Sequence, residues 1–185
     1  QASNWGGYGT AVGKLKQPMG IVRVGTNLYV ADTGNNRIQR FNSSTGVQDL
    51  SWGSYGASSG QFDAPQGIAV DSTQTYLFVA DTNNNRIQAM VVSGGAVASV
   101  AGTLGTGINK FSSPKGIAVI GSSSPYTVWV ADTGNNRIVQ YQFVVSAGPA
   151  YVLNYVASFG SYGTGNNQFN QPNKIINDAE TSPNL

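Results

Sequence analysis

A nine-residue motif occurs three times in the chain, and this repetition constrains the fold more than any other feature. Each copy reads Val-Ala-Asp-Thr, then Gly or Asn, then Asn-Asn-Arg-Ile, and the three aspartates are Asp32, Asp81 and Asp132. These aspartates stand about 50 residues apart, a period typical of arrays in which each unit buries its apolar face against a neighbour. The sequence therefore predicts a repeat protein.

Two further markers precede each motif in a constant order. A Pro-x-Gly-Ile marker lies at Pro18, Pro65 and Pro114. An aromatic-Gly-x-Tyr-Gly marker comes before it, and its copies begin at Trp5, Trp52 and Phe159, with a weaker version at Ala101. A fourth unit therefore opens at Phe159, but it carries Lys174 in place of the glycine after its proline. We predict one region over 1–185 with approximate repeats 5–51, 52–100 and 101–158 and a partial repeat 159–185.

Within the second repeat, short strands are expected at 67–70, 76–80, 86–91 and 97–100, because apolar runs alternate there with polar turns. Charged residues make up only 10% of the chain and there are 24 glycines, which suits many short strands joined by tight turns. Four strands in a unit of about 50 residues are typical of a β-propeller blade. The predicted fold class is all-β, with propeller blades of four antiparallel strands.

The Pro-x-Gly-Ile-Ala-Val, Val-Ala-Asp and Asn-Asn-Arg-Ile motifs resemble NHL repeats, and this resemblance covers nearly the whole chain. It implies propeller blades, although NHL propellers usually close with about six blades. The array is thus expected to be incomplete or completed by other chains. It could be a fragment of a longer chain, half of a two-chain ring, or a unit that stacks end to end. Trp5 resembles the end of an outermost strand and 165–178 an innermost strand, which suits head-to-tail contact.

Each repeated turn offers an Asp, an Asn and an Arg, which are the candidate binding residues of the chain. Two interpretations stay open: the three side chains hold the turn together, or they form a polar ring that binds a ligand. Each turn supplies one carboxylate, too few oxygens for a cation such as Ca²⁺, so no metal is predicted. The candidates are Asp32, Asn35, Arg37, Asp81, Asn84, Arg86, Asp132, Asn135 and Arg137.

The aromatic marker and an insertion are further candidates for contact with a partner. Trp5, Trp52 and Phe159 are expected to pack between blades, whereas the tyrosines of the marker could stay exposed and contact a protein or a sugar. The third repeat is longer near 146–151, and inserted loops often carry specific contacts. A tolerated longer hairpin is the alternative. The candidate residues of the insertion are Pro149, Tyr151 and Tyr155.

The composition argues against catalysis. The chain has no His and no Cys, so a Ser–His–Asp triad, a His-bound zinc and a Cys nucleophile are all excluded. The resemblance includes a lyase that depends on His-bound metal, which this chain cannot supply. We predict no enzyme activity and no cofactor; a propeller hydrolase or lyase whose site lies outside this chain is the distant alternative.

The predicted function is a structural or assembly subunit, or a protein-interaction scaffold; the alternative is a ligand- or partner-sensing recognition module that is a fragment of a larger six-bladed propeller. The expected partners are other protein chains, copies of this one included, and carbohydrate stays open. Net charge is only +2, and the basic residues are scattered, which argues against nucleic acid. No apolar run is long enough to span a membrane. We expect an extracellular or cell-surface location after removal of a signal peptide; whether the sequon at Asn42 is glycosylated stays open.

Overall fold

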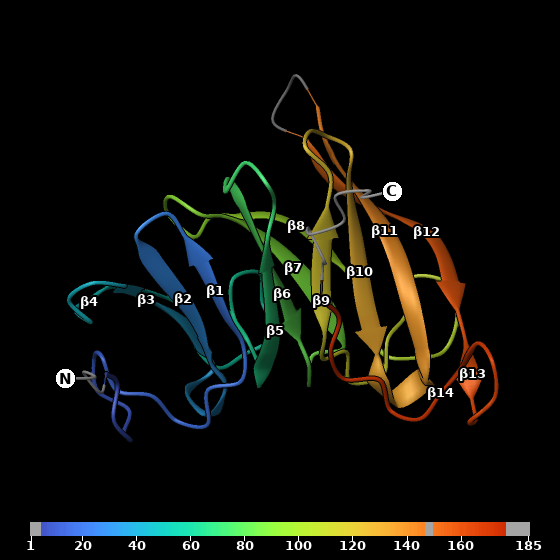
Figure 1. Cartoon of the computed structure of the whole chain (residues 1–185), viewed down its shortest axis with the longest axis horizontal. Helices are drawn as coiled ribbons and strands as arrows, with labels where there is room; N and C mark the ends of the chain where they lie inside the picture. Colours follow the sequence, from blue (N-terminus) through green and yellow to red (C-terminus); the bar gives the residue numbers. More distant parts are fainter. Residues whose placement is uncertain (1–4, 147–149, 177–185) are drawn as a thin grey trace, which may run out of the picture.

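The protein is an array of four-stranded antiparallel sheets that lie side by side as blades (Figure 1). The computed structural model describes residues 5–146 and 150–176, and this part of the chain holds three complete blades. In each blade the strands follow one another in chain order from the innermost to the outermost. The predicted fold class is therefore confirmed.

The strands have the following bounds. The first blade contains β1 (Ile21–Val24), β2 (Asn27–Asp32), β3 (Arg37–Asn42) and β4 (Gln48–Trp52). The second contains β5 (Pro65–Val70), β6 (Tyr76–Asp81), β7 (Arg86–Val91) and β8 (Val97–Ala101). The third contains β9 (Ile117–Ile120), β10 (Tyr126–Asp132), β11 (Arg137–Val145) and β12 (Tyr151–Phe159). A short parallel pair, β13 (Ser161–Tyr162) and β14 (Gln168–Phe169), follows, and the 3-10 turns η1 (Thr33–Asn35) and η2 (Thr133–Asn135) join second to third strands.

The turn between the second and third strands is closed by an asparagine in the left-handed conformation. Asn36, Asn85 and Asn136 have φ angles of 56°, 55° and 53°. Asparagine tolerates this conformation better than most residues because its short polar side chain can form local hydrogen bonds. The repeated Asn-Asn-Arg sequence therefore ends one strand and begins the next at the same point in every blade.

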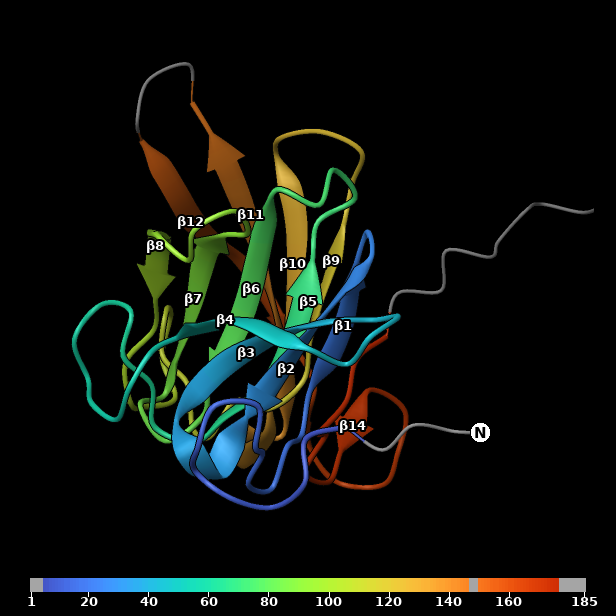
Figure 2. The same ribbon diagram turned by 90° about the vertical axis from the view of Figure 1, so that its left-hand side faces the viewer.

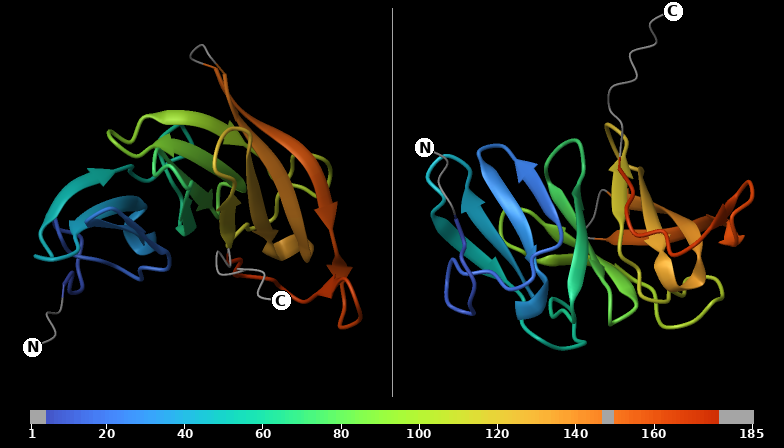
Figure 3. Two further views of the ribbon diagram at one scale, coloured as in Figure 1. Left: turned by 45° about the horizontal axis from the view of Figure 1, so that its top comes forward. Right: turned by 60° about the horizontal axis from the view of Figure 1, so that its bottom comes forward.

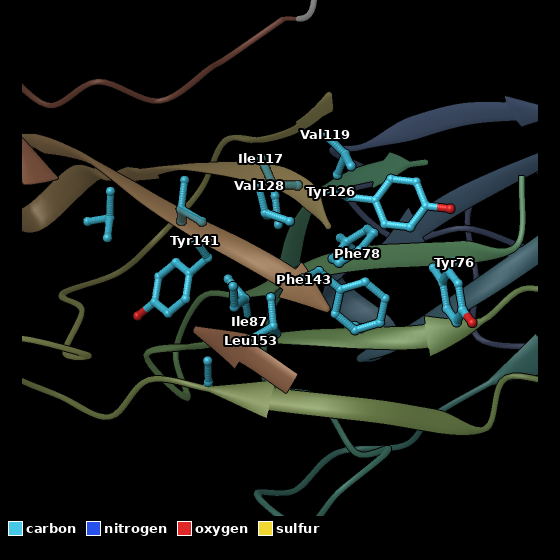
Figure 4. Close-up of a cluster of buried hydrophobic side chains, with 14 of the residues drawn as sticks. Tyr76, Phe78, Ile87, Ile117, Val119, Tyr126, Val128, Tyr141, Phe143 and Leu153 are labelled. Atoms are coloured by element: carbon cyan, nitrogen blue, oxygen red, sulfur yellow. The ribbon is translucent and has the colours of Figure 1, made fainter. Parts of the chain in front are cut away.

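The core lies between the blades, because each sheet has apolar side chains on both faces. One cluster joins blades 1 and 2 and includes Tyr29, Leu77 and Val79. The other joins blades 2 and 3, where Phe78 and Phe143 are fully buried and meet edge to face at 5.1 Å between ring centres (Figure 4). Burying one such side chain stabilises the fold by about 1.5–3 kcal/mol, so contact between blades is the main source of stability.

The glycine of the Pro-x-Gly-Ile marker lets neighbouring inner strands approach closely at the concave side of the array (Figure 3). A Cβ atom on Gly20 would collide with the carbonyl oxygen of Gln66, and one on Gly67 with the carbonyl oxygen of Lys115. No side chain fits at these positions. Lys174 stands at the same place in the fourth unit, so the next inner strand could not approach this unit as closely.

Candidate interaction surfaces

Each blade contains one clasp, which we define as the Asp, Asn and Arg of the repeated motif. The three aspartates end the second strand and are fully buried. In the clasp of blade 2, the Arg86 Nε donates to Asp81 Oδ2 at 2.7 Å and the backbone N–H of Asp63 donates to Asp81 Oδ1 at 2.8 Å. Asn84 Nδ2 also donates to Asp81, at 2.9 Å. The carboxylate thus meets its partners within the chain and has no open face toward solvent.

The clasp binds the loop that leads into its blade. We call these loops the tip loops, and they span 5–15, 52–62, 101–111 and 159–169. Arg86 donates to three carbonyl oxygens of tip loop 52–62, including that of Gln61 at 2.9 Å, and Asn84 donates to the carbonyl oxygen of Gly56 at 2.8 Å. The clasps of blades 1 and 3 form the equivalent bonds to their own tip loops.

The structure brings all nine candidate residues of the repeated turns into these three clasps. Burial raises the pKa of Asp81, and the hydrogen bonds from Asp63, Asn84 and Arg86 oppose that rise. Among the described residues, no group of three or more His, Cys, Asp or Glu side chains is placed to hold a metal ion. The clasps therefore position the tip loops through bonds inside the chain.

Two repeated residues that the sequence analysis passed over connect each clasp to the next unit. Thr33 Oγ1 donates to the carbonyl oxygen of Pro65 at 2.7 Å, and Asn36 Oδ1 accepts from the backbone N–H of Ala64 at 2.7 Å. The later units repeat both bonds. Their recurrence in the motif was the signal that could have revealed them, because a residue kept in every unit usually serves the contact between units.

A buried glutamine strengthens the clasp in two blades and is missing from the third. Gln88 donates to the carbonyl oxygen of Gln61 at 2.7 Å and accepts from the backbone N–H of Gly60 at 3.0 Å. Gln39 forms the same pair of bonds in blade 1. Blade 3 has Val139 at this position, and there the Tyr141 hydroxyl donates to Asn109 Oδ1 at 2.8 Å instead.

The aromatic markers divide into buried and exposed residues. Trp52 is buried between blades 1 and 2, as expected, whereas Phe159 is 48% exposed on the outer face of blade 3. The expected outermost strand that ends at Trp5 lies outside the described residues except for Trp5 itself, which lies over Gly46 at a hairpin turn. The fourth residue of each marker is strongly exposed in all four tip loops: Tyr8 81%, Tyr55 71%, Leu104 67% and Tyr162 71%.

The insertion of the third repeat lengthens the outer hairpin of blade 3, whose strands β11 and β12 have nine residues each (Figure 2). Tyr151 stacks on Phe143 at 6.2 Å between ring centres and meets Tyr76 of blade 2 edge to face at 5.6 Å. Tyr155 meets Tyr141 edge to face at 5.9 Å. Pro149 lies outside the described residues. Both tyrosines of this candidate set are half-buried in contacts within the chain.

A channel with a volume of about 470 Å³ runs between β1, β5, β9 and segment 173–176 of the fourth unit. The innermost strand expected in this unit is not formed over 170–176. Its polar lining comes from Gln66, Lys115, Asn173 and Lys174, and its apolar lining comes from residues such as Met19. The described lining contains two lysines and no carboxylate. The channel is thus a concave feature on the axis of the array.

Exposed apolar side chains gather on both outermost faces of the array, among polar ones such as Gln142 and Asn154 on blade 3. On blade 1, a groove of about 500 Å³ is lined by Trp5, Leu15, Leu28, Val30 and Phe41, among others. On the far face of blade 3, the exposed apolar side chains are Ile120 45%, Val152 43%, Val156 44% and Phe159 48%. Both faces lie at the ends of the row of blades.

No protein-family model matches the chain, and no curated protein matches it in sequence. Within the described residues, none of the helices has the length and apolar character needed to cross a membrane.

Solved structures resemble the chain in fold. Hydrazine synthase of Kuenenia stuttgartiensis is 15% identical and has a TM-score of 0.59, over 91% of this chain and 42% of that one. The WD40 repeats of RRP9 are 13% identical with a TM-score of 0.53, over 77% and 40%. A chain of the nidogen/laminin complex is 17% identical with a TM-score of 0.52, over 80% and 54%.

The chain spans about two fifths to about half of the length of these three structures. Their low identities show the fold alone. With the three blades described above, they establish a β-propeller fold, while membership of the NHL family stays a prediction.

Proposed function

We propose that the chain is a non-catalytic propeller scaffold whose two outer blade faces bind other protein chains, copies of itself among them. The observation that carries this proposal is the group of exposed apolar side chains on each of the two faces. An extended apolar surface usually marks a contact with another protein. In this proposal the protein acts outside the cell or on its surface. The chain contains no cysteine that an oxidising environment would convert to a disulfide.

The two outer faces carry the residue types that the inner faces bury. Leu28 and Val30 line the groove on blade 1, and their counterparts in blade 2, Leu77 and Val79, are fully buried against blade 1. Trp129 lies on the far face of blade 3, where it meets Phe159 at 5.8 Å between ring centres. The face of blade 1 thus carries the residue types that blade 2 buries against blade 1, and the far face of blade 3 is the one on which a next blade would pack. Two such different, matching faces are what a head-to-tail contact between copies requires.

The ends of the array limit the strength of such a contact. Tip loops 5–15 and 159–169 hold equivalent places on their units, since each forms the same parallel bridge. A copy docked on blade 3 with the geometry found inside the chain would bring its loop 5–15 onto loop 159–169. One loop must move away, so we expect a reversible contact that depends on concentration.

The test is the native mass of the particle, measured by light scattering over a series of concentrations. We expect a mass that rises above the 19.3 kDa of one chain. Ile21→Glu places a charge on the face of blade 1, and Val156→Glu places one on the face of blade 3. Each variant keeps one open face, so a mixture of the two should form a dimer that cannot grow.

Val100→Glu is the matched control, because Val100 is 40% exposed on the outer strand of the middle blade, away from both faces. It should assemble like the unchanged chain. A mass of 19.3 kDa at every concentration would contradict self-association, and the scaffold would then need a different protein partner.

The channel favours a second candidate function, a recognition module that senses a small ligand. Ligand pockets in proteins usually have volumes of about 300–1,000 Å³ and a few polar groups among apolar ones. The channel falls in this range and holds two lysines. Thermal unfolding with small carboxylates and phosphates tests this candidate: stabilisation that Lys115→Met removes would support it.

A further inference from the structure

The four tip loops present equivalent apolar residues to solvent. Parallel bridges pair Tyr8 with Leu15, Tyr55 with Phe62 and Leu104 with Phe111, and β13 pairs with β14 in the same way in the fourth loop. Each parallel pairing closes its loop, so the four tip loops share one compact conformation. Figure 1 shows the first loop and the β13–β14 loop at the lower end of the array. Large side chains that are more than two thirds exposed at a repeated position usually serve an interaction.

A polar side chain accompanies the exposed residue in every tip loop. The glycine after that residue lets the side chain five positions further on lie against the backbone, since a Cβ on Gly56 would collide with Gln61. The same holds for Gly105 and Lys110. Along the array this polar residue alternates between a lysine and an amide: Lys14, Gln61, Lys110 and Gln168.

The clasps hold the first three tip loops rigidly. Arg37, Arg86 and Arg137 each pair with a buried aspartate and also donate to carbonyl oxygens of their loop. The exposed side chains therefore project from loops that lose little conformational freedom on binding. Preorganisation of this kind raises affinity because fewer degrees of freedom remain to be frozen.

Positive charge gathers at the same end of the array. All five lysines of the chain lie in the tip loops or in the segments directly after them: Lys14, Lys16, Lys110, Lys115 and Lys174. Among the described residues, Asp63 is the one acidic residue of these segments, since the aspartates of the clasps belong to the strands and are paired with arginine. The end that carries the tip loops is thus cationic although the chain as a whole is nearly neutral.

We propose that the tip loops form one extended site for an acidic polysaccharide, which goes beyond the scaffold function and uses a different surface. The apolar faces of sugar rings would pack on Tyr8, Tyr55, Leu104 and Tyr162. Lysines would pair with carboxylates of the polymer, and the amides would bond to hydroxyl groups of the intervening sugars.

The charge pattern favours a polysaccharide over a single-stranded nucleic acid. Nucleic acid is bound best by arginine, which grips phosphate with two parallel hydrogen bonds, and every arginine at this end is already used in a clasp. Two lysines that alternate with two amides are a sparse set of cations. This density suits a polymer in which charged and neutral sugars follow one another.

The test is retardation of the protein in native gels that contain half-methyl-esterified polygalacturonate, in which charged and neutral sugars follow one another. We expect retardation that weakens as salt is raised, because part of the attraction is between exposed charges. Fully methyl-esterified polygalacturonate keeps the sugar rings and loses the carboxylates, so it should retard the protein less. An oligodeoxythymidylate gel is the nucleic-acid comparison and should retard it less still.

Tyr55→Ser and Tyr162→Ser together should weaken the affinity by about tenfold, the loss expected for an aromatic contact residue. Lys14→Gln with Lys110→Gln should reduce both the affinity and its dependence on salt. Leu104→Tyr completes the aromatic row and should tighten binding. Arg23→Gln, away from the tip loops, should leave retardation unchanged.

Unchanged thermal midpoints would show that the variants fold, because the altered side chains are exposed. The proposal is overturned if the half-esterified polymer gives no retardation, if the double tyrosine variant is retarded like the unchanged chain, or if the oligonucleotide binds more tightly than the polysaccharide. Self-association through the outer faces is measured separately by mass, so failure of either proposal leaves the other standing.

Discussion

The two ends of the blades are built on different principles. At the lower end, all three blades use the same clasp, tip loop and left-handed asparagine. At the upper end, blades 1 and 2 have short outer hairpins whose glycine turns are covered by Trp5 and Trp52. Before blade 3 the corresponding residue is Ala101, at the end of β8, and blade 3 has a longer hairpin that contacts Tyr76 of blade 2 through Tyr151.

This difference shows where the array tolerates change. A clasp connects a strand, its tip loop and, through the adjoining threonine and asparagine, the next unit, so altering it disturbs several elements at once. The outer hairpin contacts one neighbouring blade, so it can be longer in a blade where no tryptophan covers its turn. Repetition at one end and variety at the other follow from the number of contacts that each end makes.

The largest expected loss of stability comes from a substitution in a clasp, at the lower end of the blades. Asp81→Ala should lower the free energy of unfolding by about 3–5 kcal/mol, because it leaves a nearly buried arginine without its carboxylate. Urea denaturation measures this loss. Asp49→Ala is the matched control: its pair with Arg40 is half exposed, and its loss should lower stability by less than about 1 kcal/mol. Equal losses in the two variants would contradict the importance of the clasp.

The next largest loss of stability tests the glutamine that accompanies the clasps of blades 1 and 2 and is absent from blade 3. Gln88→Val gives blade 2 the residue of blade 3, and it leaves the backbone N–H of Gly60 without its partner. We expect a loss of about 1–2 kcal/mol, the lower part of the range for an unsatisfied donor because Gly60 is half-buried, and the same loss for Gln39→Val. If either variant is as stable as the unchanged chain in urea, the glutamine is not part of what holds the tip loop.

A smaller loss of stability is expected at the upper end of the blades, in the outer hairpin of blade 3. Tyr151→Ala removes a half-buried ring that contacts both Phe143 and Tyr76, and we expect a loss of about 1 kcal/mol in urea denaturation. Tyr162→Ala, which removes a strongly exposed ring, should leave stability unchanged. A loss of similar size in both variants would show that the hairpin does not support blade 2.

The smallest effect appears only at high pH. Burial, together with a hydrogen bond to Tyr151, raises the pKa of Tyr76 to about 12 from its ordinary value of 10.0. A raised pKa in the folded state means that the neutral phenol contributes stability below pH 10.0, and this contribution is lost as the pH rises through about 12. Tyr76→Phe should therefore lose less stability than the unchanged chain between pH 9.0 and about pH 11. Parallel losses would contradict the shift.

Much of the architecture was predictable because the same sequence pattern occurs in every repeat. The strands expected at 76–80 and 86–91 are found as β6 and β7, since each lies between a polar turn and an apolar neighbour. The pairing of Asp81 with Arg86 was one of two open interpretations, and the structure shows it in every blade. The partners in the tip loop were not predictable, because they are backbone carbonyl groups that every residue carries.

The sequence by itself determined the propeller blades, their number in the described residues and the position of each clasp. These depend on local periodicity and on motifs that recur, which can be read along the chain. Only the tertiary structure decided that Tyr55 is exposed while Trp52, three residues earlier, is buried. It also decided that five lysines gather at one end. Exposure and charge clustering depend on which residues distant in sequence lie side by side, and packing between blades sets that arrangement.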